Sequence, residues 1–186
     1  MNNQIPVHMD KAAFLNWVER QDGRYELVEG RVIAGDPPCR AHALIATDLL
    51  ILLSARLDRR QWVSLLAFGL DIRPETIRFP DIVVDRAGGD CNDRTATAPV
   101  LIAEVLSPST AAIDLGDKAA EYLQLPSLAA YLVFSEDEPN AWVWIKGEQG
   151  FPPAPAVLNG KDEIIWIPAL KLTLPLSALY ASVELE

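Results

Sequence analysis

The apolar residues of this chain recur at two spacings, one typical of helices and the other of strands. Residues 10–20 have helical spacing, and apolar residues cover most of 41–57, which predicts a short helix and a long, largely buried one. Alternation in 62–73 predicts a strand, and 77–84 predicts a second strand paired antiparallel with it. Residues 100–106 are apolar on both faces, which is typical of the central strand of a sheet.

Shorter elements surround these segments. Residues 24–34 predict a hairpin, and residues 114–124 predict a helix with Asp114 as its N-cap. Further strands and a last helical turn are predicted at 129–134, 141–145, 163–167, 170–174 and 175–181. No internal repeat or linker interrupts this order. We therefore expect a single mixed α+β domain that covers residues 1–186.

Length and composition agree with one globular domain. The chain has 186 residues, of which 50% are hydrophobic, enough for a sizeable core. It has no apolar run of about 18 residues, so we expect no transmembrane helix, and its N-terminus lacks the pattern of a secretory signal. Cys39 and Cys91 are solitary and far apart, which excludes a cysteine-based zinc site and fits a reducing cytoplasm. We expect a cytoplasmic protein.

The net charge of −10 is unevenly distributed. Residues 1–80 contain 10 basic and 10 acidic residues, whereas residues 81–186 contain 6 and 16. Such an acidic balance disfavours a general nucleic-acid binder, which needs a basic surface. The nearest approach to a set of phosphate-contacting residues lies in the neutral part, at Arg40, Arg56, Arg59 and Arg60.

Two carboxylates occur where strands are expected to be buried. Glu104 lies in the middle of the apolar strand 100–106, and no residue near it in the sequence offers a partner. A buried carboxylate is costly unless it takes a proton, pairs with a charge or binds a cation. Asp81 follows Pro80 at the start of the β-branched run PDIVV in the preceding strand, and neighbouring strands lie about 4.8 Å apart. A divalent cation such as Mg²⁺ between the two acids would relieve their repulsion, whereas a salt-bridged or protonated structural Glu104 is the alternative.

Three further polar residues share one face of the helix predicted after Glu104. Asp114, Lys118 and Tyr122 are spaced i, i+4 and i+8. A functional lysine next to the two acids and an ordinary surface ion pair between Asp114 and Lys118 are both open from this spacing.

Glu26 and His42 are less specific candidates. Glu26 lies in the first hairpin, where a surface glutamate or a pair with Arg31 would also explain it. His42 points to the buried side of the helix 41–57, as either a core histidine or a site residue.

Taken in order, these residues resemble the Uma2 (DUF820) family of endonuclease-like proteins, in the PD-(D/E)xK nuclease superfamily. The general superfamily motif has a lysine two residues after the second acid, where this chain has Leu106. In Uma2-like chains the lysine is displaced onto the following helix, and Lys118 matches that position. The resemblance implies a restriction-endonuclease-like core, with a central mixed sheet flanked by helices. The segments that carry it are RYELVEGRVI, RAHALIATDLL, RFPDIVVD, LIAEVLSPST and DLGDKAAEY.

The family resemblance also implies metal-dependent hydrolysis of DNA phosphodiester bonds. Asp81 and Glu104 would hold Mg²⁺ or Mn²⁺, with the Val105 carbonyl as a further ligand. Lys118 would position the attacking water or stabilise the transition state, and Glu26 would bind metal, hold a metal-bound water or orient the lysine. Secondary candidates for orienting the phosphate or the acids are His42, Asp114 and Tyr122.

Two other functions stay open from the sequence. One is a catalytically inactive interaction protein that keeps the nuclease fold, and the other is a hydrolase of a small phosphodiester. If DNA is the partner, the acidic charge predicts weak, salt-sensitive and metal-dependent binding. By analogy with related nucleases we expect a homodimer, for which residues 141–145 are either an exposed edge strand or core. No membrane partner is expected.

Overall fold

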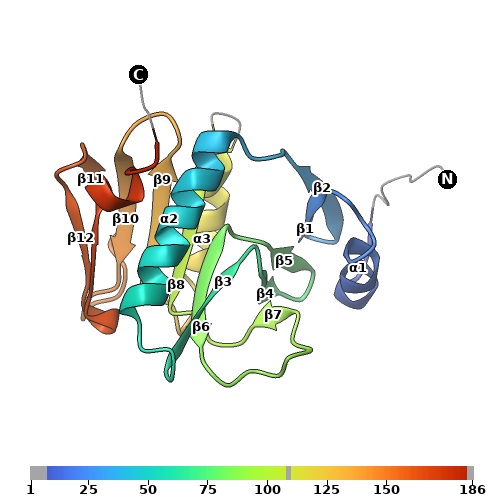
Figure 1. Cartoon of the computed structure of the whole chain (residues 1–186). Coiled ribbons are helices and arrows are strands. Elements are labelled where there is room, and N and C mark those ends of the chain that lie inside the picture. Colours follow the sequence, from blue (N-terminus) through green and yellow to red (C-terminus); the bar gives the residue numbers. More distant parts are fainter. Residues whose placement is uncertain (1–7, 108–109, 184–186) are drawn as a thin grey trace.

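The computed structural model describes residues 8–107 and 110–183, and it has the mixed α+β architecture that the sequence predicts (Figure 1). Pro108 and Ser109 of the EVLSPS segment lie outside the described residues. That residues 1–186 form one domain stays a prediction. In the described part of the chain, no helix is long and apolar enough to cross a membrane.

Two sheets and a separate hairpin contain the strands. The six-stranded sheet has the order β11 (Ala156–Asn159), β10 (Asn140–Ile145), β9 (Ala130–Ser135), β8 (Leu101–Leu106), β6 (Ile82–Arg86) and β3 (Trp62–Leu66). The five-stranded sheet has the order β2 (Arg31–Gly35), β1 (Arg24–Val28), β5 (Thr76–Arg78), β4 (Gly69–Arg73) and β7 (Thr95–Ala96). The separate hairpin consists of β12 (Ile164–Ile167) and β13 (Leu172–Pro175).

Helices cover both faces of the six-stranded sheet. The long helix α2 (Arg40–Arg56) packs on one face, in the larger core cluster, and α3 (Lys118–Tyr122) packs on the other (Figure 1). A π-helical turn, η1 (Ile113–Asp117), leads directly into α3. The shorter helices are α1 (Lys11–Val18), with Asp10 as its N-cap, the 3₁₀ turn η2 (Pro168–Leu170) and α4 (Leu176–Leu179).

Strand β8 is the central strand that the sequence predicts. All six of its residues are buried, and it pairs antiparallel with β6 and parallel with β9. Its alternate residues face opposite cores, with Ala103 and Val105 toward α2 and Ile102 and Leu106 toward α3. Glu104 therefore lies on the α3 face of the sheet.

The two long strands predicted at 62–73 and 77–84 are both interrupted, and this part of the prediction is wrong. Residues 62–73 divide into β3 and β4 at Ala67, which has a left-handed backbone with φ of 47°. Residues 77–84 divide into β5 and β6, between which Pro80 has no N–H for a ladder bond. The predicted antiparallel pairing holds on both sides of the break. The Ala67 N–H donates to the Asp81 carbonyl at 3.0 Å, so the two breaks face each other and place Asp81 at the corner between the sheets.

The left-handed Ala67 provides a first test of this corner. Ala67→Gly is expected to raise the free energy of unfolding by about 0.5–1 kcal/mol, because a left-handed backbone costs a non-glycine residue more than glycine's extra chain entropy. The measurement is urea denaturation beside Ala98→Gly, which sits at a half-buried position without positive φ. Equal destabilisation by both substitutions would contradict the assignment of strain to this corner.

Two smaller predictions also need correction. Helical backbone begins at Ala111, ahead of Asp114, so Asp114 lies inside the π-helical turn and is not an N-cap. Residues 141–145 do not form an exposed edge, because β10 lies between β9 and β11 and its Trp144 is buried. The edge strand β11 follows the Pro-rich stretch and was not expected from the alternation pattern.

Candidate active site

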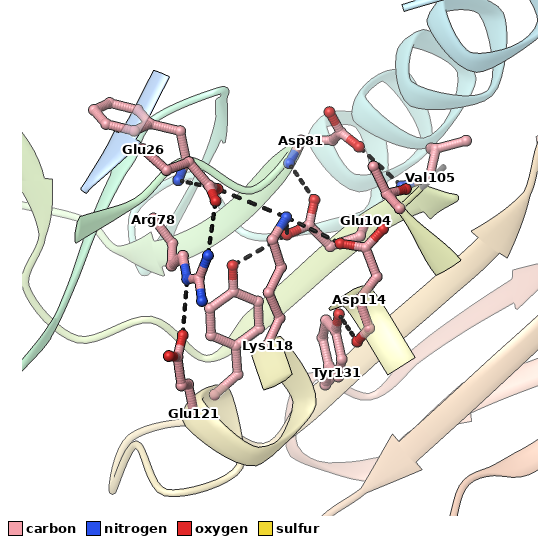
Figure 2. Close-up of polar contacts among 12 residues, drawn as sticks. Glu26, Arg78, Asp81, Glu104, Val105, Asp114, Lys118, Glu121 and Tyr131 are labelled. Atoms are coloured by element: carbon pink, nitrogen blue, oxygen red, sulfur yellow. Dashed lines mark hydrogen bonds and ion pairs between the residues drawn. The ribbon is translucent and has the colours of Figure 1, made fainter. Parts of the chain in front are cut away.

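Lys118 lies at the centre of a cluster of carboxylates at the edge of the α3 face. Its Nζ atom is 2.9 Å from Glu104 Oε1, 3.0 Å from Asp114 Oδ1 and 3.6 Å from Glu26 Oε1 (Figure 2). The Tyr122 hydroxyl donates to the same Glu104 oxygen at 3.1 Å. Asp114, Lys118 and Tyr122 thus share one helix face, as their spacing predicts, and this face points at Glu104. The ion pair with Asp114 is buried, so the alternative of a surface pair is excluded.

Asp81 is held against β8 by reciprocal backbone bonds. Its Oδ2 accepts from the Val105 N–H at 2.9 Å, and its own N–H donates to Glu104 Oε2 at 3.2 Å (Figure 2). Its Oδ1 is 3.1 Å from His42 Nε2 and 2.8 Å from Arg24 Nη2. The two acids predicted to be neighbours are therefore joined through backbone hydrogen bonds, and His42 is a site residue rather than part of the apolar core.

Glu26 reaches the cluster from the other sheet. Its Oε1 accepts from the Phe79 N–H at 3.1 Å, and its Oε2 accepts from Arg78 Nη1 at 2.9 Å (Figure 2). Arg78 is buried, and its Nε donates to Glu121 at 2.8 Å. The alternative partner Arg31 is exposed and lies opposite Val28 in the hairpin register. Glu26 is therefore fixed by Arg78 and contacts Lys118.

A cavity of about 280 Å³ opens onto this cluster. Asp81, Glu104 and Lys118 line it, whereas Tyr122 is fully buried behind Glu104. The remaining predicted site residues that line it are Glu26, His42, Val105 and Asp114. The structure thus brings together around one cavity every residue that the family resemblance implied, with Tyr122 in support.

Sequence reasoning missed three charged residues of the site. Arg24 precedes Glu26 by two residues on a strand, so the alternation of side chains was a usable signal for it. Arg78 and Glu136 had no such signal. Glu136 Oε2 is 3.8 Å from His42 Nδ1 and accepts from the Cys39 thiol at 3.1 Å, so His42 lies between two carboxylates.

The predicted set of four arginines is not one set. Arg40 and Arg56 begin and end α2, which separates them by roughly 24 Å. Arg56 instead donates to the Thr173 carbonyl. The basic residues that line the cavity, within the described part of the chain, are Arg24 and Lys118.

The charges of the cluster change the protonation of its members. Burial raises the pKa of Glu104 to about 8, since the attraction of Lys118 does not outweigh burial together with the nearby carboxylates. For Asp81 burial acts in the same direction, but the bonds from His42, Val105 and Arg24 prevail and lower its pKa to about 2. Burial disfavours the Lys118 ammonium, yet Glu104, Glu26 and Asp114 raise its pKa above the ordinary value, so it stays protonated.

The donor set fits a hard divalent cation. Asp81, directly before β6, and Glu104, on the adjacent strand β8, supply carboxylate oxygens, which are the ligands that Mg²⁺ and Mn²⁺ prefer. Burial is the main cause of the raised pKa of Glu104 and the neighbouring carboxylates add to it, and a bound cation would favour the charged form. Within residues 8–107 and 110–183, no three His, Cys, Asp or Glu side chains are already arranged as a ligand set. The fit therefore rests on the chemistry of the two acids.

Comparisons with known proteins identify the family of this chain. The Uma2 family, described as "Putative restriction endonuclease", matches residues 12–177. "Uncharacterized protein slr1290" of Synechocystis sp. is 31% identical over 144 residues, which is 74% of each chain. "Uncharacterized protein sll1609" of the same organism is 28% identical over 133 residues, covering 67% of this chain and 73% of that protein.

A solved structure shows the same fold. The crystal structure of "a putative nuclease belonging to DUF820" from Anabaena variabilis superposes with a TM-score of 0.75, covering 93% of this chain and 98% of that one. At 18% identity this likeness concerns the fold, and it confirms the predicted restriction-endonuclease-like core. With the family match over most of its length, the chain belongs to the Uma2 family.

Proposed function

We propose that this protein is a metal-dependent nuclease that hydrolyses phosphodiester bonds of DNA. The observation that carries the proposal is the convergence on one cavity of Asp81 before β6, Glu104 on β8 and Lys118 on α3. Acids of this kind hold a divalent cation, and a lysine beside them offers positive charge to a phosphate. Family membership supports the same class of reaction.

Each side chain of the site has its own role in this proposal. Asp81 and Glu104 would hold Mg²⁺ or Mn²⁺, with the Val105 carbonyl as a further ligand, and the cation would activate water and offset charge on the phosphate. Lys118 stays protonated, so it stabilises charge that develops on the phosphoryl oxygens rather than acting as a base. Glu26 contacts Lys118 and orients it.

Residues around this centre support those roles. Arg24 binds Asp81 and is 39% exposed at the cavity, so it can also contact a phosphate. His42 holds Asp81, Asp114 pairs with Lys118, and Tyr122 holds Glu104. A cytoplasmic location, weak metal-dependent DNA binding and a homodimer remain predictions.

Plasmid nicking tests the proposal. In Mg²⁺ or Mn²⁺, Glu104→Gln is expected to lower the cleavage rate by at least about 10²-fold, because the cation loses a charged ligand. Glu163→Gln is the matched control, since Glu163 is exposed and lies outside the cavity lining. Wild-type protein that cleaves in neither metal, or a Glu104→Gln variant that cleaves at the wild-type rate, would refute it.

One observation favours a second candidate, an inactive interaction protein. Lys118 already pairs with Glu104, Glu26 and Asp114, so the fold neutralises much of the cluster with its own lysine. Thermal unfolding separates the two functions. A bound cation at 100 times its Kd stabilises the folded state by about 2.7 kcal/mol, whereas an unchanged melting temperature in millimolar Mn²⁺ would favour the inactive protein.

A further inference from the structure

The cavity that contains the proposed active site has a charged floor and an apolar rim. Its deep side chains, Asp81, Glu104 and Lys118, are buried. The outer lining includes large apolar groups that remain exposed, with Ile33 at 45% and Ile113 at 41%. With two prolines of the segment between β2 and α2, they form the apolar rim: Ile33, Pro37, Pro38 and Ile113.

The fold places the rim directly beside the charged floor. Ile33 on β2 pairs with Glu26 on β1, so both side chains project from the same face of the hairpin. Ile113 begins the π-helical turn and immediately precedes Asp114. In both places an apolar residue of the rim is therefore the direct neighbour of a charged residue of the cavity, so a ligand held at the floor meets the rim.

The lining suits a duplex poorly. Arg24 and Lys118 are its basic residues in the described part of the chain, and Lys118 is already paired with three carboxylates. Double-stranded DNA carries about one negative charge per 1.7 Å, and its binding depends on basic side chains along both backbones. The acidic residues that line the cavity outnumber the basic ones: Glu26, Asp36, Asp81, Glu104, Asp114 and Glu136.

We propose that the apolar rim receives an unpaired nucleobase next to the scissile phosphate, which makes locally unpaired nucleic acid the substrate class. This inference rests on the proposed nuclease function. A base that leaves its stack exposes flat apolar faces, and proteins hold such bases between aromatic or aliphatic side chains. The cavity of about 280 Å³ is at the small end of ligand pockets, which suits one nucleotide. Arg24 would hold the neighbouring phosphate, so a single strand needs few further cations.

The test compares one labelled sequence in Mn²⁺ as a single strand, as a duplex and as a duplex with one unpaired loop. We expect kcat/KM to be about tenfold higher for the single strand and the loop than for the duplex. Ile33→Ser is expected to lower kcat/KM on the single strand by about tenfold, mainly through KM, because it removes apolar surface that would pack against the base. Ile51→Ser is the matched control, since Ile51 is 59% exposed on α2 and outside the cavity lining.

An abasic strand separates base binding from a general effect on the fold. Loss of the bases should reduce cleavage by the wild type about tenfold and should cause little further loss in Ile33→Ser, because both changes remove the same contact. Equal cleavage of duplex and single strand, or equal effects of Ile33→Ser and Ile51→Ser, would overturn the inference.

A measurement of DNA affinity tests the inference separately from the cleavage assay. If no DNA is cut, the proposed function fails, and fluorescence anisotropy then measures the affinity of the same oligonucleotides. The rim is supported if Glu104→Gln protein binds the single strand about tenfold more tightly than the duplex and loses this preference on addition of Ile33→Ser. Equal affinities, or binding to neither form, contradict it.

Discussion

Lys118→Met is expected to lower the free energy of unfolding at pH 8 by about 3–5 kcal/mol, which is the usual cost of leaving a buried ion pair without one partner. The reason lies in the cluster, where Lys118 Nζ lies within 3.6 Å of Glu104, Glu26 and Asp114. Methionine fills nearly the same volume, so lost packing contributes little. The loss should be smaller at pH 5, because protonation of Glu104 leaves fewer charges unpaired.

Urea denaturation in EDTA measures this effect. The double variant Lys118→Met with Glu104→Gln should recover part of the loss, since it removes a charge on each side and leaves Tyr122 an acceptor. Lys161→Met is the control, because Lys161 is exposed and should change stability by less than about 0.5 kcal/mol. Similar effects of the two lysine substitutions would show that Lys118 does not neutralise the cluster.

The metal-free protein is expected to lose stability on the order of 3 kcal/mol between pH 5 and pH 8. The pKa of Glu104 is raised to about 8 in the folded state, so the folded protein holds this proton over a range where the unfolded chain has released it. Its effect on stability is therefore smallest near pH 5 and most unfavourable above pH 8. Asp81 does not add to this change between pH 5 and pH 8. Its pKa is lowered to about 2, so its stabilising effect on the folded state is lost only below about pH 4. Lys118 titrates well above this range.

Equilibrium unfolding in EDTA at several pH values between 5 and 8 tests this profile. Glu104→Gln should flatten the profile and should be more stable than the wild type at pH 8, while Glu163→Gln should keep the wild-type slope. Excess Mn²⁺ should stabilise the wild type more at pH 8 than at pH 5, because the cation replaces the proton on Glu104. A wild-type profile without this slope would mean that Glu104 ionises normally.

The expected effects of Lys118→Met and of pH on stability both follow from the proposed chemistry. A site that holds a catalytic cation keeps its acids close together, and this closeness costs stability when the cation is absent. Lys118 offsets part of that cost and stays protonated, which suits a role in stabilising a phosphate. Loss of stability on removal of metal would thus accompany nuclease activity.

The sequence by itself determined the type and order of most elements and identified the two acids of the proposed site. A continuous apolar run identified β8, and the polar residue within it identified Glu104, because burial of a charge is too costly to be accidental. Helical spacing placed Lys118 and Tyr122 on one face. These signals are local, since periodicity along a single element reports which side of it is buried.

Only the tertiary structure decided which distant residues complete the site. Arg24 binds Asp81 across 57 positions in the chain, and Arg78 binds Glu26 across 52. These contacts arise because both predicted long strands break at the corner near Asp81 and continue in another sheet. In residues 62–73 the alternation of apolar residues persists through that corner, so the pattern could not reveal it. Pairing between sheets, rather than periodicity within one strand, therefore decides the surroundings of the two acids.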